Sequence, residues 1–531
     1  MQRMMIHITF ATLLILCITG CKKKLEDLYN DPDETTQASI EKFFTEMLDN
    51  ERVRPSYWEV RTFTVLQTGI YSQSIGYLNN TGAYQQNPSY TQDRWNDFYR
   101  PGANGGGAMA HFRAIESAYN SMSADDQAEA KVFLEAAKVV MYDQAAQMVD
   151  CWGDLPFSDA GSLTANGEIV MAKFDDASAI YENILDGLKL AAYYFSHPSH
   201  SSTTQLVFDR QDILLSGSLD KWQRYANSLR LRLLMRISFA DEAFAQTEVM
   251  TILNNPSLYP LIDGETIYSP AETDVLLQPL TNYTDDLHNA LTELTNYSAP
   301  GYLLNNVMKP ASDPRIPVMF DKYGRTVADV FVPNTDYNGL PVNMPLEQQQ
   351  INIGNFAILD SATFLFNSKL PGIVMTAAEV NFLKAEAFER WGGGDAKTFY
   401  EKAIKQSVIF YYYLNSRNTI TRTPLTLPAD SVINQFIQKT SILYSGTAEE
   451  KLAKIWTQKW AHFGFLQAIQ SWAECRRTKY PQLTFYLSAL PGYQLPPARL
   501  VYPASETTYN SNYLLVKDKD TRDRKIFWDV R

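Results

Sequence analysis

A helical hairpin between residues 376 and 413 constrains the fold of this chain more than any other stretch. Thr376 and Glu379 have the spacing of a capping box, which predicts the start of a helix. Gly392 to Gly394 end that helix, and Asp395 begins a second one with small and apolar residues on one face. Two helices of this length joined by a tight turn resemble a tetratricopeptide unit of about 34 residues.

Other stretches repeat the pattern of a capping residue followed by apolar residues at helical spacing. Ser123 with Asp126 nearly matches a capping box, Asp175 or Asp176 caps the next helix, and Trp222 marks a third. Because 531 residues exceed what one compact core usually holds, we expect several domains or one helical array. The predicted fold class is all-α (mainly helical), with tetratricopeptide-like helix pairs as scaffold, long irregular ligand-binding loops and minor β structure.

Long segments without helical periodicity separate these helices. They cover residues 70–107, 254–375 and 480–531, and residues 373–375 are compatible with a short strand. Such segments exceed ordinary connections, and ordered loops on a rigid scaffold are where binding residues usually lie. We therefore expect a loop-rich ligand-binding face.

Residues 1–20 have the features of a lipoprotein signal peptide. Arg3 supplies the positive charge, and the apolar run over residues 10–18 is too short to span a bilayer. The run ends in Ile-Thr-Gly before Cys21, which resembles the bacterial lipobox, whose cysteine is lipidated and becomes the new N-terminus. Several acyl chains anchor a protein stably. Residues 21–35 are mostly polar, so we expect a lipidated flexible tether there, and no later stretch reads as a transmembrane helix.

Composition argues against two classes of protein. With 47 Lys and Arg against 59 Asp and Glu, the net charge of −12 disfavours nucleic-acid binding. Three cysteines remain beyond the signal, Cys21, Cys151 and Cys475, which do not make a disulfide framework. The sequence leaves open whether Cys151 and Cys475 form one bridge or stay as free thiols.

The sequence carries no catalytic or metal-binding motif, so we expect no enzyme activity, no cofactor and no metal site. The histidines are scattered, and no His-Glu-x-x-His, Gly-x-Ser-x-Gly or phosphate-binding loop occurs. A glycosidase is the enzymatic alternative, because two carboxylates about 5–10 Å apart leave no sequence motif. Asp285 and Asp286 are the pair to test, since the other acidic pairs fall at expected helix N-termini.

An ordered set of motifs resembles the SusD/RagB-like outer-membrane lipoproteins. Besides the lipobox, the motifs are Cys-Trp-Gly-Asp-Leu-Pro-Phe-Ser at 151–158, the Trp- and Arg-rich stretch 221–236, Asp-Pro-Arg at 313–315, residues 385–395, Gln-Lys-Trp at 458–460, residues 472–481, residues 499–503 and Phe-Trp-Asp at 527–529. They span nearly the whole chain and are together far more specific than any one of them. Trp222, Trp460 and Trp472 are expected in the core, and Arg476 and Arg477 at helix-end carbonyls or a buried carboxylate.

The resemblance implies a function that the spacing of residues does not. It implies one SusD-like helical domain over residues 36–531, lipid-anchored at the outer membrane and facing the cell surface. It also implies that the protein binds a poly- or oligosaccharide and delivers it to a SusC-like TonB-dependent transporter, over which it sits as a lid. Some family members bind peptides instead, so peptide capture is the alternative within the same fold.

Two segments combine the aromatic rings and amides that a carbohydrate site needs. The candidate ligand-binding residues are Tyr77, Asn80, Tyr84, Asn87, Tyr90 and Trp95 in the first segment, and Asn282, Tyr283, Tyr302 and Tyr323 in the second. The alternative for any one of them is that it only packs its loop onto the scaffold.

Overall fold

The computed structural model describes residues 39–50, 52–53, 57–100, 107–163, 167, 170–265, 267–279, 288–290, 292 and 298–531. The signal peptide, the tether with Cys21, and the pairs Asn282–Tyr283 and Asp285–Asp286 lie outside these residues. The fold is mainly α-helical with minor β structure, as the sequence predicts. Within the described ranges, no helix is both long and apolar enough to cross a membrane.

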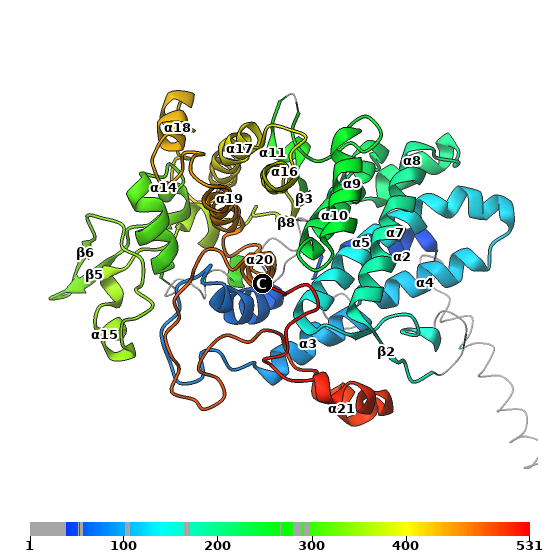
Figure 1. Cartoon of the computed structure of the whole chain (residues 1–531), viewed down its shortest axis with the longest axis horizontal. Helices are drawn as coiled ribbons and strands as arrows, with labels where there is room; N and C mark the ends of the chain where they lie inside the picture. Colours follow the sequence, from blue (N-terminus) through cyan, green and yellow to red (C-terminus); the bar gives the residue numbers. More distant parts are fainter. Residues whose placement is uncertain are drawn as a thin grey trace, which may run out of the picture.

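The N-terminal helices form a packed layer. They are α2 (Ile40–Leu48), the π-helix η1 (Glu59–Gly69), α3 (Pro88–Tyr99), α4 (Ala108–Asn120), α5 (Ala124–Trp152), α7 (Ala177–Ser196), α8 (Ser202–Gln211), α9 (Leu219–Ile237) and α10 (Glu242–Asn254). Helix α4 packs on α5, α5 on α7 and α7 on α9, in the right half of Figure 1. Ser123, Asp176 and Ser218 cap α5, α7 and α9 with side-chain oxygens, so Asp176 rather than Asp175 is the second cap.

Helices α16 (Ala377–Trp391) and α17 (Ala396–Ser416) are the predicted hairpin and pack directly on each other. The remaining C-terminal helices are α18 (Asp430–Ile437), α19 (Ala448–Phe463), α20 (Ala468–Thr478), α21 (Ala504–Tyr509), η5 (Ser511–Leu515) and η6 (Lys517–Lys519). Thr376 caps α16 by accepting a hydrogen bond from the Glu379 N–H at 3.2 Å. The Glu379 carboxylate does not complete the capping box, because it binds Arg232 of α9 at 2.6 Å. That ion pair ties the hairpin to the N-terminal layer.

The described residues between 254 and 375 include several short elements. The helical ones are α11 (Pro270–Thr273), η2 (Tyr302–Met308), α13 (Lys309–Ala311), α14 (Ile316–Met319), α15 (Leu346–Ile351), η3 (Ile353–Asn355) and η4 (Ser361–Leu365). The strands of the chain are β1 (Leu155–Pro156), β2 (Phe174–Asp175), β3 (Val275–Leu277), β4 (Phe320–Asp321), β5 (Gly324–Val327), β6 (Val330–Pro333), β7 (Ile358–Leu359) and β8 (Gly372–Met375). They pair antiparallel as β1–β2, β3–β8, β4–β7 and β5–β6. Strand β8 contains the strand expected at 373–375.

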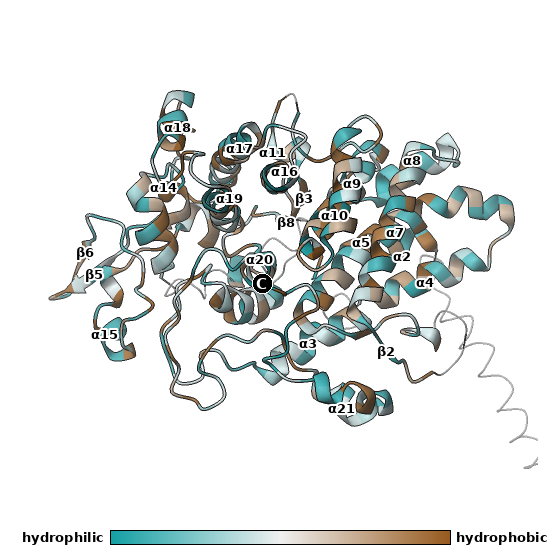
Figure 2. Cartoon of the chain, in the orientation of Figure 1, coloured by the Kyte–Doolittle hydropathy of each residue, from teal (hydrophilic) through white to brown (hydrophobic). Residues whose placement is uncertain are grey.

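The β5–β6 hairpin is an exposed apolar element. Its Val330 and Phe331 side chains are 63% and 55% exposed. Figure 2 shows their brown, hydrophobic ribbon at the left edge of the molecule. Ala328 and Asp329 both have positive φ at its tip, as a two-residue hairpin turn requires.

Residues 88–99 correct one expectation, because they form helix α3 and not part of a long loop. Asn87 is its N-cap and Pro88 its first residue, which is a favourable combination. Thr91, Arg94 and Trp95 are buried along one face. A buried arginine on that face interrupts the apolar periodicity by which such a helix is recognised in a sequence.

The three motif tryptophans lie in the interior, as expected. Trp222, Trp460 and Trp472 are at most 1% exposed. Arg477 binds the Glu386 carboxylate through two hydrogen bonds of 2.7 Å, so it pairs with a buried carboxylate. Cys151 and Cys475 are free thiols, and burial raises the pKa of each to about 12. Both therefore stay protonated and unreactive at neutral pH.

A buried histidine makes the stability of the fold depend on pH. His462 lies between Thr376 Oγ1 at 2.7 Å and Ser407 Oγ at 2.9 Å. Burial, and then the nearby Arg315 cation, lower the pKa of His462 from 6.5 to about 3. Since the unfolded chain binds this proton first, stability is lost as the pH falls from about 6.5 towards 3.

We expect this residue to contribute a loss of about 1.4 kcal/mol per pH unit between pH 6 and pH 4. Denaturant unfolding at a series of pH values should show a shallower acid slope for His462→Gln than for the unmodified protein. Equal slopes would contradict the assignment. His197→Gln is the control, because His197 lies at the exposed end of α7.

Candidate ligand-binding site

A pocket forms where three loops far apart in sequence meet. Residues 70–84 supply one wall, Pro300 and Gly301 a second, and residues 340–349 a third. The volume of the pocket is about 450 Å³ when the open space at its mouth is included. Its interior has room for only about two water molecules. A larger ligand would therefore lie across the mouth and insert single groups.

Glycines let these three loops touch through their backbones. A Cβ on Gly76 would lie 2.3 Å from Ser298 O, and one on Gly301 would lie 2.2 Å from Leu340 O. The Gly76 N–H donates to Ser298 O at 3.0 Å, and the Leu340 N–H donates to Ala299 O at 2.8 Å. The walls of the pocket are thus held together by direct backbone contact, which leaves no room for a side chain at either glycine.

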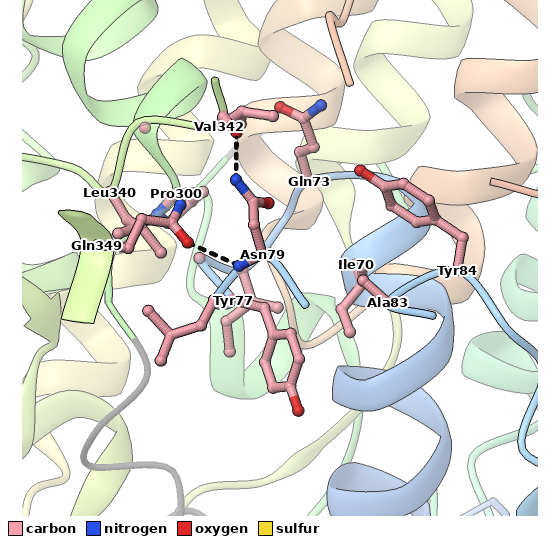
Figure 3. A pocket seen from close by; sticks show the side chains of 14 residues that line it. Ile70, Gln73, Tyr77, Asn79, Ala83, Tyr84, Pro300, Leu340, Val342 and Gln349 are labelled. Carbon is pink, nitrogen blue, oxygen red and sulfur yellow. Dashed lines mark hydrogen bonds between the residues drawn. The ribbon is translucent and has the colours of Figure 1, made fainter. Parts of the chain in front are cut away.

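Asn79 and Gln349 fix the third loop against the first. The Asn79 side-chain amide donates to Val342 O at 2.6 Å and Met344 O at 2.8 Å. In return, Gln349 Oε1 accepts the Asn79 backbone N–H at 2.6 Å, while Gln349 Nε2 donates to Pro341 O at 2.9 Å. Figure 3 draws two of these bonds, from Asn79 to Val342 and from Asn79 to Gln349 across the pocket. Both amides are therefore committed to holding the loops.

Gln73 is different, because it leaves an acceptor unused. Its Nε2 donates to Thr484 O at 2.6 Å, but its buried Oε1 has no hydrogen-bond partner among the described residues. A buried acceptor without a partner costs about 1–3 kcal/mol. A ligand hydroxyl or a water that donates to Gln73 Oε1 would recover that free energy.

Two tyrosines complete the lining. Tyr77 is half-buried, and Tyr84 is 4% exposed with its ring edge-on to Phe485 at 6.0 Å between centroids. Burial raises the pKa of Tyr84 to about 12, so its hydroxyl remains a neutral donor and acceptor at any ordinary pH. Figure 3 shows Tyr77, Tyr84 and Gln73 around the same opening. The pocket thus offers aromatic carbon and neutral polar groups, with no charged side chain in its lining.

Of the candidate residues from the sequence, the pocket gathers Tyr77 and Tyr84 only. Asn80 lies in the adjoining turn, where its carbonyl accepts the Ala83 N–H. Asn87 caps α3, and the Tyr90 hydroxyl accepts from Arg61 at 3.5 Å. Trp95 is 1% exposed and donates through Nε1 to Glu506, so the protein covers both of its faces.

The second candidate segment contributes less. Asn282 and Tyr283 lie outside the described residues. Tyr302 follows Gly301 directly, but its ring packs against Trp460 at 6.1 Å. Tyr323 is 43% exposed at the base of the β5–β6 hairpin and contacts Phe331. Neither ring lines the pocket.

The sequence missed Gln73, Leu340, Val342 and Gln349 as lining residues. None of them belongs to a motif, and Gln349 stands in a run of three glutamines that reads as solvent-exposed. One feature of the sequence could have indicated this meeting of segments: each contains a glycine, namely Gly76, Gly301 or Gly339. In the described part of the chain, no group of three or more His, Cys, Asp or Glu side chains is placed to hold a metal ion.

Fold and pocket together define a class of protein: a scaffold of stacked helix pairs that presents a small, neutral, aromatic and amide-lined pocket on its loops. The sequence profile of the SusD-like family, described as starch-binding and associating with the outer membrane, matches residues 31–503. The chain belongs to this SusD-like family. No curated protein matches it.

Solved structures share the fold over nearly their whole length. One named a chitin-binding protein is 19% identical, with a TM-score of 0.72 over 92% of this chain and 99% of that one. A SusD homologue from Bacteroides fragilis is 20% identical, with a TM-score of 0.71 over 93% of this chain and 100% of the homologue. A SusD homologue from Parabacteroides distasonis is 19% identical, with a TM-score of 0.69 over 93% and 98%.

Proposed function

We propose that this protein captures a neutral oligosaccharide at the pocket between Gln73, Tyr77 and Gly301 and passes it to a TonB-dependent outer-membrane transporter. In this proposal residues 36–531 are one helical domain, tethered to the cell surface through a lipid on Cys21. The protein performs no chemistry on its ligand. The family description and the name of the chitin-binding relative support a glycan over other ligands.

The unpaired Gln73 Oε1 is the observation that carries the proposal. A sugar presents hydroxyl donors beside apolar C–H faces, which is the complement of a buried amide acceptor next to tyrosine rings. The small interior suits one hydroxyl inserted from a chain lying across the mouth. A peptide would instead require backbone partners or charged side chains in the lining.

A glycan-array and affinity-gel screen of the full chain, in a detergent without a sugar headgroup, tests the proposal. Saturable retention by one polysaccharide, with no new reducing ends over time, is the expected result. Retention by no glycan would overturn it and make extended peptides the next ligands to screen. Release of reducing ends would show a glycosidase, to be tested with Asp285→Asn and Asp286→Asn.

Tyr77→Ala should weaken binding of the retained glycan at least tenfold, and Gln73→Met about two- to tenfold. The first removes the half-buried ring of the pocket. The second removes the free acceptor, worth about 0.5–1.5 kcal/mol, together with the Nε2 donor to Thr484 O. Calorimetric titration measures both. Tyr259→Ala is the matched control, since Tyr259 is half-buried outside the pocket and should leave the affinity unchanged. Equal losses in all three variants would contradict the assignment.

Cys21→Ala should abolish lipid attachment and release the protein from the membrane fraction. Lipid anchoring depends on the acyl chains, and the described residues contain no membrane-spanning helix. Labelling with a clickable fatty acid and sedimentation of membranes measure the two effects. Cys17→Ala is the control inside the same segment and should stay lipidated. Labelled protein in the Cys21→Ala strain would contradict the lipobox interpretation.

A further inference from the structure

A groove in the N-terminal helical layer lies apart from the pocket described above. Its lining comes from α4, α5, α7 and the β1–β2 region and encloses about 840 Å³, counted out to open solvent. Its cavity volume without the open solvent is about 380 Å³, within the range of about 300–1,000 Å³ that is usual for pockets that hold small ligands. Its helices stand in the right half of Figure 1, whereas α15, which carries Gln349 of the first pocket, stands at the lower left.

The charged residues of the groove are neutralised by one another and by backbone groups. Arg113 binds Glu116 at 2.6 Å and donates to the carbonyls of Phe157 and Ala160. Asp175 accepts from the backbone N–H groups of Phe157 and Ser158. Lys138 pairs at 2.9 Å with Glu135, which lies outside the lining. The lining itself has two cations, Arg113 and Lys138, and two carboxylates, Glu116 and Asp175. This arrangement therefore does not favour a charged ligand over a neutral one.

Two neutral polar groups in the groove have no partner in the described part of the chain. The Tyr142 side chain of α5 is 92% buried, being 8% exposed, and its hydroxyl makes no hydrogen bond within those residues. Gly187 of α7 makes room for that ring, because a Cβ there would lie 2.3 Å from the hydroxyl. Asn183 of α7 offers a free amide at the rim. Burial raises the pKa of Tyr142 to about 12, which keeps the hydroxyl neutral.

The floor beneath these groups is apolar. Phe112, Met141, Phe157 and Ile180 line it. An apolar floor, a tyrosine hydroxyl and a free amide together match a molecule with one C–H face and a ring of neutral hydroxyls. A carboxylate or ammonium ligand would lose hydration here without gaining an unpaired counter-charge.

We propose that this groove is a second saccharide-binding site, which takes a neutral mono- or disaccharide unit that donates or accepts hydrogen bonds at Tyr142 and Asn183. It is built from different helices than the first pocket, so it binds sugar independently of the first. A chain with both sites would hold two parts of one polysaccharide, or two molecules, at once.

The test uses full-length Tyr77→Ala protein, in which the first pocket is disabled, and saturation-transfer NMR with maltose, cellobiose and diacetylchitobiose as probes. We expect saturation transfer to at least one of them and none to galacturonate, the anionic control. Ala179→Trp, at an exposed position on α7 that lines the groove, should weaken that binding at least tenfold by filling the groove. Tyr142→Phe should weaken it about fivefold by removing only the hydroxyl.

Leu190→Trp places the same indole side chain on α7 at a 67% exposed position outside the groove and should leave binding unchanged. No transfer to any neutral probe, or transfer unaffected by Ala179→Trp, would overturn the second site. If only the first pocket were wrongly assigned, the result would differ. Sugar binding by the unmodified protein would then be unaffected by Tyr77→Ala and lost in Ala179→Trp.

Discussion

Replacing Glu386 with alanine should destabilise the folded protein by about 3–5 kcal/mol, because it leaves buried cations without their counter-charge. Glu386 is fully buried on α16. Its carboxylate receives two hydrogen bonds from Arg477 and lies 3.6 Å from Lys459 and 3.4 Å from Arg390. Without it, Arg477 and Lys459 would keep only Glu474 as a carboxylate partner among the described residues, and Glu474 also pairs with Arg236.

Equilibrium unfolding in urea measures this loss as a lower midpoint at an unchanged slope. Glu386→Gln keeps the volume of the side chain and some of its hydrogen bonds, so its cost should fall between zero and that of alanine. Glu272→Ala is the control at an exposed pair, since the Glu272 side chain is 78% exposed and 3.5 Å from Lys221. Its cost should stay below about 1 kcal/mol. A cost for Glu386→Ala within that same range would contradict the role assigned to the buried network.

The same carboxylate adds to the acid sensitivity of the protein. Arg477 and then Lys459 hold the pKa of Glu386 near 2, against 4.5 for an ordinary glutamate, despite the opposing effect of burial. Because its folded pKa is depressed, this stabilisation is complete above pH 4.5 and is lost as the pH falls towards 2. The loss begins at about pH 4.5, so its window overlaps that of His462 between pH 4.5 and 3. The two variants can be told apart above pH 4.5, where of these two groups only His462 contributes.

Gly301→Ala should abolish ligand binding at the first pocket, with an affinity loss well above tenfold. The new Cβ would lie 2.2 Å from Leu340 O and 2.8 Å from Leu340 C, so the second and third loops must move apart. Their separation breaks the bond between the Leu340 N–H and Ala299 O and displaces the wall that Asn79 holds. Forcing extra volume into a packed site also costs about 1–3 kcal/mol of stability.

Titration with the retained glycan and thermal unfolding separate these two effects of Gly301→Ala. Gly492→Ala is the control for losing a loop glycine, because its Cβ would meet nothing within 4 Å and only its φ of +78° is unfavourable. That variant should lose some stability and keep its affinity. Unchanged binding by Gly301→Ala would show that the contact between loops does not shape the site.

Much of the scaffold could be predicted because helices are encoded locally. Thr376 and the glycines at 392–394 bound the α16–α17 hairpin in the sequence as they do in the structure. Helix α3 was not predicted because its buried face includes Arg94. The burial of Arg94 is possible because Gln144 and Glu59, from other segments, interact with it. Likewise, the Glu379 carboxylate does not complete the expected capping box but binds Arg232, a partner 147 residues away.

The pocket was predictable only in part. Tyr77 and Tyr84 stood out because aromatic residues and amides cluster around them, but the same argument also selected Trp95, which the core buries. Composition marks a segment as suited to carbohydrate, yet it does not tell which rings turn outward. Gln73 carries no signal of its own, since its importance lies in an acceptor that no other group in the described part of the chain reaches.

The sequence by itself determined the helix-pair scaffold, the membership of the family and the expected export signal, because capping residues, periodicity and motifs are properties of neighbouring residues. Only the tertiary structure decided which side chains meet. Gln349 reaches the backbone of Asn79 across 270 residues, and Arg477 reaches Glu386 across 91. Such contacts depend on how closely backbones can approach and on which charges are buried together, and these follow from the packing of whole elements rather than from any local pattern.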